Sequence, residues 1–356
     1  MNTKSKQIKT KKTGDKGKSK KRGIGVYALT IGILILVVIL GYILFWPVGK
    51  SGTAQYLYID NDDTEDSVME KLQPLTSESA VATIKLLSKA MDYGSHIRTG
   101  RYEIGTHGAL MTFRQLRNGN QTPISLTIPS VRTTDRLAEE VGKHMMFSAA
   151  ELADSLKDED VCKRYGFTTN TIPCMFIPNT YDLYWNIGVG KFLERMKKEY
   201  DRFWSKERQE KATAIGLSPV EVITLASIVD EETSNNGEKP MVAGMYINRL
   251  HIDMLLQADP TVKFAAKDFA AKRIYNSMLS IDNPYNTYKY KGLPPGPIRI
   301  PSVAGIDAVL NYTHHDYLYM CAKEDFSGTH NFAKTYTEHQ ANAAKYIKAL
   351  NERGIK

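Results

Sequence analysis

Three consecutive acids, Asp230, Glu231 and Glu232, lie near the end of an apolar run with the sequence LASIVDEET, which starts at Leu225. A carboxyl group held against apolar surface keeps its proton near neutral pH, because burial disfavours the charged form. A carboxylic acid that is still protonated at neutral pH can donate that proton to the leaving oxygen of a glycosidic bond. The acid cluster therefore predicts proton-transfer chemistry on a sugar.

A helix with well-marked ends must position these acids. Ser218 is suited to cap its first turn, and Pro219 is favoured at the first helical position. Glu221 follows Ser218 by three residues, which completes an S-x-x-E capping box. The sequence thus predicts a helix over residues 218–233, with the acids in its last turn.

The three acids differ in the face of this helix that they occupy. At 100° per residue, Glu232 lies about 20° from Leu225 and so projects from the apolar face. Glu231 falls with Thr224 and Ser227 on the polar face, and Asp230 lies between the two. Glu232 is therefore the acid that burial should affect most. Periodicity alone leaves open a helix that simply ends in solvated acids.

Further motifs follow this helix in a fixed order. They are MYINRL from Met245, LQADPTV from Leu256, PYNTY from Pro284, GLPPGPI from Gly292, YLY from Tyr317, HNF from His330 and EH from Glu338. Together they resemble the endolytic lytic transglycosylases of bacteria, the MltG/YceG-like family. The family pattern I-[IV]-E-x-E places its catalytic glutamate on Glu232, and Asp230 stands where the family has its first glutamate.

The resemblance implies a lyase that cuts peptidoglycan without a metal or other cofactor. Glu232 would protonate the oxygen between N-acetylmuramic acid (MurNAc) and N-acetylglucosamine (GlcNAc). The carboxylate would then take the proton of the muramic acid 6-hydroxyl as that oxygen closes a 1,6-anhydroMurNAc end. Cutting of nascent strands would terminate their elongation, with peptidoglycan synthases as partners. Two alternatives stay open: a muramidase that uses water, and a non-catalytic glycan-binding scaffold of the cell-wall elongation machinery.

The same motifs suggest which residues position the glycan. Gln257, Asn286 and Tyr288 are substrate-binding candidates by resemblance. Asp259 is either a second carboxylate in the groove or a turn-forming residue before Pro260.

An aromatic segment over residues 176–185 supplies further candidates. Tyr181 and Trp185 could stack on the flat apolar face of a sugar, although single aromatic residues more often belong to a core. Asn179 stands where the family usually has the aspartate of P-D-T-Y. That departure puts in doubt any essential carboxylate at this position.

The charge distribution points to the membrane and not to nucleic acid. The formal net charge is +8, but residues 1–22 contain ten Lys and Arg residues against one Asp. The remainder of the chain is therefore almost neutral, and no basic folded face for nucleic acid is expected. Residues 23–49 contain no charged residue. This uncharged segment is long enough to span a bilayer and too long for the apolar core of a signal peptide. The positive-inside rule places the Lys-rich tail in the cytoplasm.

These patterns predict an α+β protein of the bacterial cytoplasmic membrane, with its catalytic domain extracytoplasmic. The expected parts are a basic tail (1–22), a single transmembrane helix (23–48), a small domain (49–128) and a mainly helical α+β catalytic domain (129–356). A strand–helix–helix–strand order in the small domain resembles a LysM module, the glycan-binding unit usual in this family. A plain α+β spacer is the alternative.

Other chemistries find little support. Cys162, Cys174 and Cys321 form no C-x-x-C pair, although Cys162 and Cys174 could be joined in an oxidising compartment. The histidines lack H-E-x-x-H spacing, so no metal site is expected. His330 and His339 are expected to hydrogen-bond within the catalytic domain or to line its groove.

Overall fold

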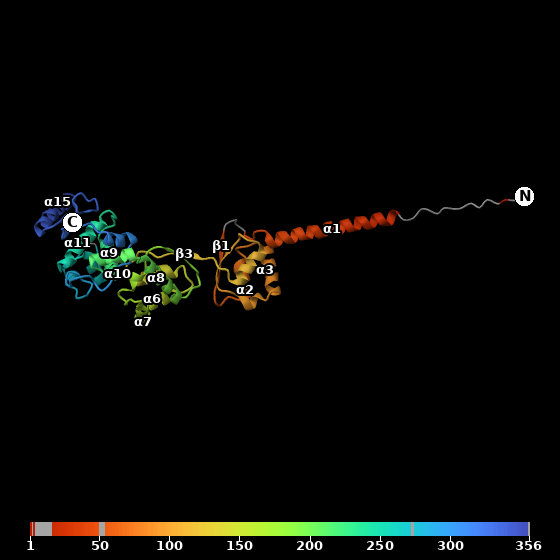
Figure 1. Cartoon of the computed structure of the whole chain (residues 1–356), viewed down its shortest axis with the longest axis horizontal. Helices are drawn as coiled ribbons and strands as arrows, with labels where there is room; N and C mark the ends of the chain where they lie inside the picture. The colour runs from red at the N-terminus through yellow and green to blue at the C-terminus, as the bar shows by residue number, and fades with distance from the viewer. Residues whose placement is uncertain (2, 4–15, 50–53, 272–273, 355–356) are drawn as a thin grey trace. The chain divides into compact units, whose positions relative to one another are not determined.

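The chain divides into two compact units, residues 1–122 and residues 123–356, in a computed structural model (Figure 1). The structure describes all residues except 2, 4–15, 50–53, 272–273 and 355–356. Most of the predicted Lys-rich tail lies outside the described residues.

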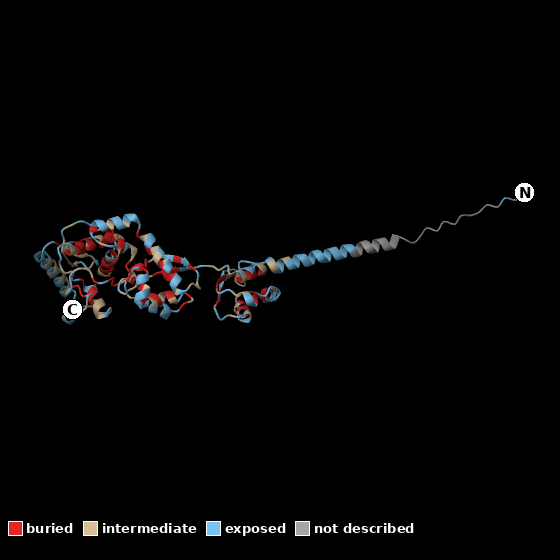
Figure 2. Cartoon of the chain, turned by 60° about the horizontal axis from the view of Figure 1, so that its bottom comes forward, coloured by how far each residue is buried: buried red, intermediate tan, exposed pale blue. Residues whose placement is uncertain are grey.

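The first unit begins with a long apolar helix, α1 (Lys16–Phe45). Its stretch Val26–Phe45 has the length and composition of a membrane span, and no residue of it is buried inside the protein. In Figure 2 the described part of this helix is coloured exposed over nearly its whole length, with a few intermediate residues near its end. Twenty helical residues extend about 30 Å, which matches the hydrocarbon core of a bilayer. The predicted apolar N-terminal helix is confirmed.

The rest of the first unit packs three α-helices and one short 3-10 helix against a two-stranded sheet. Its elements are β1 (Gln55–Ile59), α2 (Glu65–Leu72), α3 (Glu78–Ala90), η1 (Tyr93–His96), β2 (Gly100–Ile104) and α4 (Ala109–Asn118). β1 and β2 are antiparallel, with Leu57 opposite Tyr102, and both side chains are buried. The predicted strand–helix–helix–strand order is present.

The end of α1 is fixed to this small core. Pro47 forms a β-bridge with Gly108, and Val48 donates to the carbonyl of His107 over 3.0 Å. A Cβ atom on Gly108 would lie 2.4 Å from the carbonyl oxygen of Leu44, so only glycine fits this close approach. The small core therefore stays directly beside the end of the apolar helix.

The second unit is mainly helical, with two short antiparallel sheets. Its first elements are β3 (Ile124–Thr127), α5 (Thr134–Gly142), α6 (Ala149–Lys157), α7 (Glu159–Arg164), η2 (Ile172–Met175), β4 (Thr180–Leu183), α8 (Val189–Phe203) and α9 (Lys206–Ile215). The rest are α10 (Pro219–Glu232), α11 (Lys239–His251), α12 (Asp259–Ala266), α13 (Asn276–Leu279), α14 (Val303–Leu310), β5 (Tyr319–Ala322), β6 (His330–Ala333) and α15 (Tyr336–Glu352). The mixed helix and strand content agrees with the predicted α+β class.

One strand belongs to a different unit from the one that the predicted domain bounds imply. The small domain was expected to extend to residue 128, and a strand forms within that range at Ile124–Thr127. It pairs with β4, with Leu126 opposite Tyr181, and the two side chains join the core of the second unit. The division of the chain therefore lies at residue 122/123. Sequence cannot fix this assignment, because it depends on the partner of a strand and not on its propensity.

α10 lies at the centre of the second unit, and this differs from the amphipathic helix expected. Ser218 caps it through the predicted capping box with Glu221. Every residue from Val222 to Val229 is buried, so the helix has no solvated polar face. Ser227 donates to the carbonyl of Thr224 over 2.6 Å and accepts from the backbone of Ile298 over 3.0 Å. The polar residues of this helix are thus satisfied inside the core.

Candidate active site

The last turn of α10 opens into a cavity of about 330 Å³. α10 and α11 contribute one group of lining residues, the loops around α12 a second group, and the β5–β6 hairpin with α15 a third. The lining residues are Glu232, Met245, Tyr246, Arg249, Gln257, Asp259, Tyr288, Tyr319, Met320, Cys321, Ala322, His330, Tyr336 and His339. The cavity therefore gathers motifs that are spread over more than one hundred residues.

Glu232 is the proton donor that this cavity offers. Burial raises the pKa of Glu232 to about 7, and the negative charge of Asp259 acts in the same direction. The Tyr246 hydroxyl donates to Oε1 over 2.6 Å, and this bond, with the charges of His330 and Arg249, lowers the pKa. Burial outweighs them, so a large fraction of Glu232 is protonated at neutral pH.

The bond from Tyr246 also sets which oxygen of Glu232 can act. Because Oε1 accepts the phenolic hydrogen, Oε2 is the oxygen that carries the acidic proton. The same bond stabilises the carboxylate that forms once the proton is transferred. Tyr246 lies in α11, packed beside α10, and its ring is fully buried.

Arg249 lies in α11 and is hydrogen-bonded to two other segments of the chain, one just before α12 and one just before β5. Its Nε donates to the carbonyl of Leu318 over 2.6 Å, and its Nη1 donates to the carbonyl of Leu256 over 2.5 Å. The side chain is buried, and burial lowers its pKa. Because both bonds go to carbonyls, its positive charge is available to stabilise an anion in the cavity.

The loop before α12 is held in a strained conformation by two buried threonines. Gln257 has φ 47°, in the left-handed region that non-glycine residues rarely adopt. Its backbone donates to the carbonyl of Thr287 over 3.1 Å, and Ala258 donates to the hydroxyl of Thr287 over 3.0 Å. Thr261 donates to the carbonyl of Ala258 over 2.7 Å. This network presents Gln257 to the cavity, where strain of this kind is usually functional.

Asp259 is the second carboxylate of the cavity. The Tyr288 hydroxyl donates to its Oδ1 over 2.6 Å, and burial raises the pKa of Tyr288. Asp259 is the first residue of α12, and Pro260 follows in its first turn. Of the two interpretations offered by sequence, the structure favours a carboxylate in the groove.

The remaining candidate residues lie elsewhere. Asn286 is buried, and its amide donates to the carbonyls of Leu279 and Ile281, both over 2.9 Å, while its Oδ1 accepts from the backbone of Tyr288. It therefore shapes the loop that carries Tyr288.

The two aromatic candidates also lie away from the cavity lining. Tyr181 is buried in the core around β4, where its hydroxyl donates to the carbonyl of Ile177 over 2.8 Å. The half-buried Trp185 accepts from the backbone of Met146 over 3.0 Å. The structure brings neither residue together with Glu232.

Sequence reasoning missed several lining residues. Tyr246 and Arg249 lie three residues apart in MYINRL, so one face of a helix presents both. That spacing was a usable signal. Tyr319 and Tyr336 were also missed. With His339, which was expected to line the groove, they form a group of rings with centroids 5.6–6.0 Å apart, and only the tertiary fold brings this group to Glu232.

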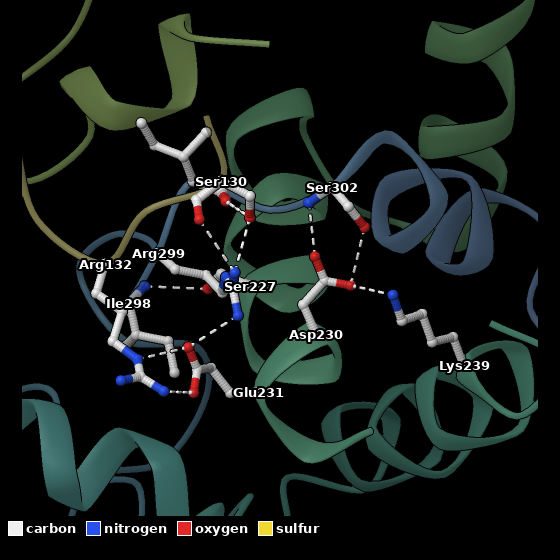
Figure 3. A network of polar contacts seen from close by, with 10 residues as sticks. Ser130, Arg132, Ser227, Asp230, Glu231, Lys239, Ile298, Arg299 and Ser302 are labelled. Carbon is white, nitrogen blue, oxygen red and sulfur yellow. Dashed lines mark hydrogen bonds and ion pairs between the residues drawn. The ribbon is translucent and has the colours of Figure 1, made fainter. Parts of the chain in front are cut away.

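The two acids before Glu232 do not line the cavity, and Figure 3 shows both of them in ion-pair networks. The buried Asp230 pairs with Lys239 over 2.8 Å and accepts from the backbone and hydroxyl of Ser302. Glu231 binds Arg132 through two bonds of 2.8 Å and Arg299 through one of 3.0 Å. These contacts fix the end of α10. Among the described residues, Glu232 forms no such ion pair.

The three cysteines are free thiols, and the pairing of Cys162 with Cys174 that sequence left open is absent. Both of these residues are buried in the second unit, and Cys321 lies in the cavity lining. Burial raises the pKa of all three thiols, which makes them poor nucleophiles.

Comparison with known proteins shows the family to which this chain belongs. The sequence profile of the YceG-like family matches residues 57–345. The chain belongs to the YceG-like family. The match includes the end of α10 and the cavity residues, and it confirms the resemblance drawn from the motifs.

Relatives of this chain share a name. An endolytic murein transglycosylase of Bacillus subtilis (strain 168) is 40% identical over 137 residues, which cover 38% of this chain and 37% of the relative. One of Streptococcus pneumoniae serotype 2 is 26% identical over 260 residues, 64% of this chain and 46% of the relative. The chain thus spans less than half the length of these relatives.

A solved structure supports the fold. The crystal structure of a YceG-like protein of Listeria monocytogenes aligns with a TM-score of 0.54 and 24% identity. The alignment covers 81% of this chain and 99% of the other. At this identity the likeness concerns the fold alone.

Proposed function

We propose that this protein is an endolytic murein transglycosylase in which Glu232 is the general acid. The observation that carries the proposal is the contrast among three adjacent acids. Glu232 alone lines a cavity and has no ion-pair partner in the described part of the chain, and burial raises its pKa to about 7. The names of the two relatives support the same activity.

The chemistry uses one acid and no cofactor. Oε2 of Glu232 donates its proton to the oxygen between MurNAc and GlcNAc as the bond to the anomeric carbon breaks. The muramic acid 6-hydroxyl attacks that carbon and passes its proton to a base in the cavity, which gives a 1,6-anhydroMurNAc end. Tyr246 and Arg249 stabilise the carboxylate that remains on Glu232. Gln257, Asp259 and Tyr288 border the bound sugar.

Mass spectrometry of the products tests this reaction. Uncrosslinked glycan is incubated with the full chain in detergent micelles, and the new ends are weighed. Transglycosylation gives anhydro ends, each lighter by one water than the reducing end left by a muramidase. Reducing ends alone would replace the proposal with hydrolysis. Binding without any cleavage would leave a glycan-binding scaffold.

The place of cutting follows from the position of the anchor. We propose that α1 crosses the cytoplasmic membrane once, with the N-terminus in the cytoplasm and the second unit outside. The LysM-like reading of the small core, a glycan-binding module beside the membrane, is part of this proposal. Strands emerging from membrane-bound synthases would then be cut internally, which limits their length.

Two measurements test the location and the cutting mode. A reporter that works only outside the cytoplasm, fused after Lys356, should be active, and activity of a cytoplasm-specific reporter there would overturn the topology. Early digestion of long strands should give a broad range of intermediate lengths. Release of terminal disaccharides alone, with strand length nearly constant, would show an exolytic enzyme.

A further inference from the structure

A carboxylate–histidine pair lies in the same cavity as Glu232. His330 begins β6, and its Nδ1 lies 3.0 Å from Oε2 of Glu238. The other oxygen, Oε1, accepts from the backbone of His330 over 2.6 Å. Glu238 is buried and His330 nearly so, with 8% and 16% of their side chains exposed. One carboxylate thus fixes both the main chain and the ring of this histidine.

The hydrogen bond with Glu238 determines the tautomer of the His330 imidazole ring. A carboxylate accepts only, so the neutral imidazole places its hydrogen on Nδ1. Nε2 is then a free acceptor, and among the described residues it has no hydrogen-bond partner. Because His330 lines the cavity, this acceptor is available to a bound sugar. A carboxylate that orients a histidine in this way is the arrangement found in general-base catalysis.

The pair is built next to the acid. Glu238 is the N-cap residue of α11, the helix that also carries Tyr246 and Arg249, and only residues 233–237 separate it from Glu232. His330 is close enough that, when it is protonated, it lowers the pKa of the Glu232 carboxyl. One cavity therefore holds a protonated carboxyl group and a separate, oriented base.

We propose that His330 is a second catalytic residue, the base that takes the proton of the muramic acid 6-hydroxyl, and that Glu238 is its positioning residue. This inference rests on the proposed function. The bond between the anomeric carbon and the leaving oxygen breaks, and that oxygen takes the proton of Glu232. The 6-oxygen bonds to the anomeric carbon, and its proton passes to Nε2 of His330. Transfer of that proton from His330 to Glu232, directly or through water, restores both groups.

If His330 is the base, the two proton transfers are performed by two residues, and not by the Glu232 carboxyl in turn. A substrate with a 4-nitrophenyl leaving group separates them, because that group departs without protonation. The probe is an oligosaccharide that carries 4-nitrophenol on the anomeric carbon of its terminal MurNAc. With this probe the acid is dispensable, whereas the base is still required.

The variants are Glu232→Gln, His330→Asn and Glu238→Gln in the full chain. His330→Asn retains a donor for Glu238 but lacks Nε2. On glycan strands, Glu232→Gln and His330→Asn should each lower kcat by about 10²-fold or more. On the nitrophenyl probe, Glu232→Gln should recover most of its activity and His330→Asn should not.

Glu238→Gln should lower kcat about tenfold with KM nearly unchanged. His314→Asn, the same change at an exposed histidine outside the cavity, is the control.

A further variant covers the case in which His330→Asn folds poorly. Added imidazole should restore part of the activity of His330→Ala, because it replaces the missing base. Folded His330→Asn with a kcat within about threefold of the parent would overturn the inference. So would Glu232→Gln that stays inactive on the nitrophenyl probe. If the parent protein yields reducing ends, the proposed function itself fails; anhydro ends with an active His330→Asn reject only the role of His330.

Discussion

The two sides of the last turn of α10 use the same chemical group in opposite ways. On one side, Asp230 and Glu231 are held by Lys239, Arg132 and Arg299, and Ser302 adds two hydrogen bonds to Asp230. On the other side, Glu232 faces a cavity and accepts one bond from a neutral phenol. The partner of each carboxyl, and not its place in the sequence, decides whether it supports the fold or transfers a proton.

This difference has a physical cause. A cation within hydrogen-bond distance keeps a carboxylate ionised and gives it a structural role. Burial without a cation partner favours the protonated form, and Glu232 accordingly has a pKa near 7. The ion pairs also hold the helix end rigid, so that the unpaired acid is presented in one position.

Glu232→Gln should have the largest effect on activity. Glutamine keeps the shape of the side chain but has no acidic proton, so kcat on glycan should fall by roughly 10²–10⁴-fold. Release of glycan fragments by the full chain in micelles measures this. The matched control is Glu231→Gln, the same change one residue earlier. Equal losses in both variants at equal folded fraction would erase the distinction between the two sides.

Lys239→Met should have the largest effect on stability. It removes the cation beside Asp230, and both side chains are nearly inaccessible, with 7% and 4% exposed. Leaving one member of a buried ion pair uncompensated costs about 3–5 kcal/mol. Chemical denaturation measures the difference. Lys334→Met, which breaks an exposed pair with Asp316, should leave the stability almost unchanged, because water screens that pair. Similar costs for the two variants would show that the network carries little of the stability.

Glu231→Gln should reduce stability by an intermediate amount. It weakens the charged bonds to Arg132 and Arg299, worth on the order of 1–3 kcal/mol in all. Activity per folded molecule should change little, because Glu231 does not line the cavity. The melting temperature and kcat are measured on the same sample. A normal melting temperature combined with a large fall in kcat would assign this acid to the chemistry.

A smaller effect concerns the stability of Glu232→Gln as pH changes. The folded pKa of about 7 lies above the value of 4.5 for an ordinary glutamate, so between these values the folded parent holds a proton that the unfolded chain has lost. The stability of the parent therefore falls as pH rises from 4.5 through 7, whereas glutamine cannot ionise. The variant should gain stability relative to the parent across this interval, and the gain should level off above pH 7. Melting at several pH values measures the gain, and a difference independent of pH would indicate an ordinary pKa.

Local signals in the sequence predicted the helix well, and they singled out an acid that lines the cavity. The capping box at Ser218 and Glu221 forms as expected, and the angular argument singled out Glu232 before any motif was considered. The order of the later motifs identified the family. Each of these features depends on residues that are close together or in a fixed order along the chain, so the sequence alone is enough to predict it.

Tertiary partners could not be predicted in this way. Thr224 and Ser227 suggested a solvated face, yet both are buried and bonded within the core. Tyr181 and Trp185 suggested sugar stacking, but neither lines the cavity that holds Glu232, and Tyr181 pairs in register with Leu126 inside the core. The Glu238–His330 pair joins residues separated by 92 positions, and nothing in their spacing indicates that they meet.

The pH dependence of kcat/KM tests the central claim most directly. If Glu232 must be protonated and has a pKa near 7, activity should fall as pH rises through about that value. Tyr246→Phe removes a bond that lowers the pKa, so the alkaline limb should move to higher pH. Asp259→Asn removes a charge that raises the pKa, so the limb should move to lower pH. A profile that stays flat through this range, or variants that shift it in the opposite directions, would contradict the assignment of Glu232 as the buried acid.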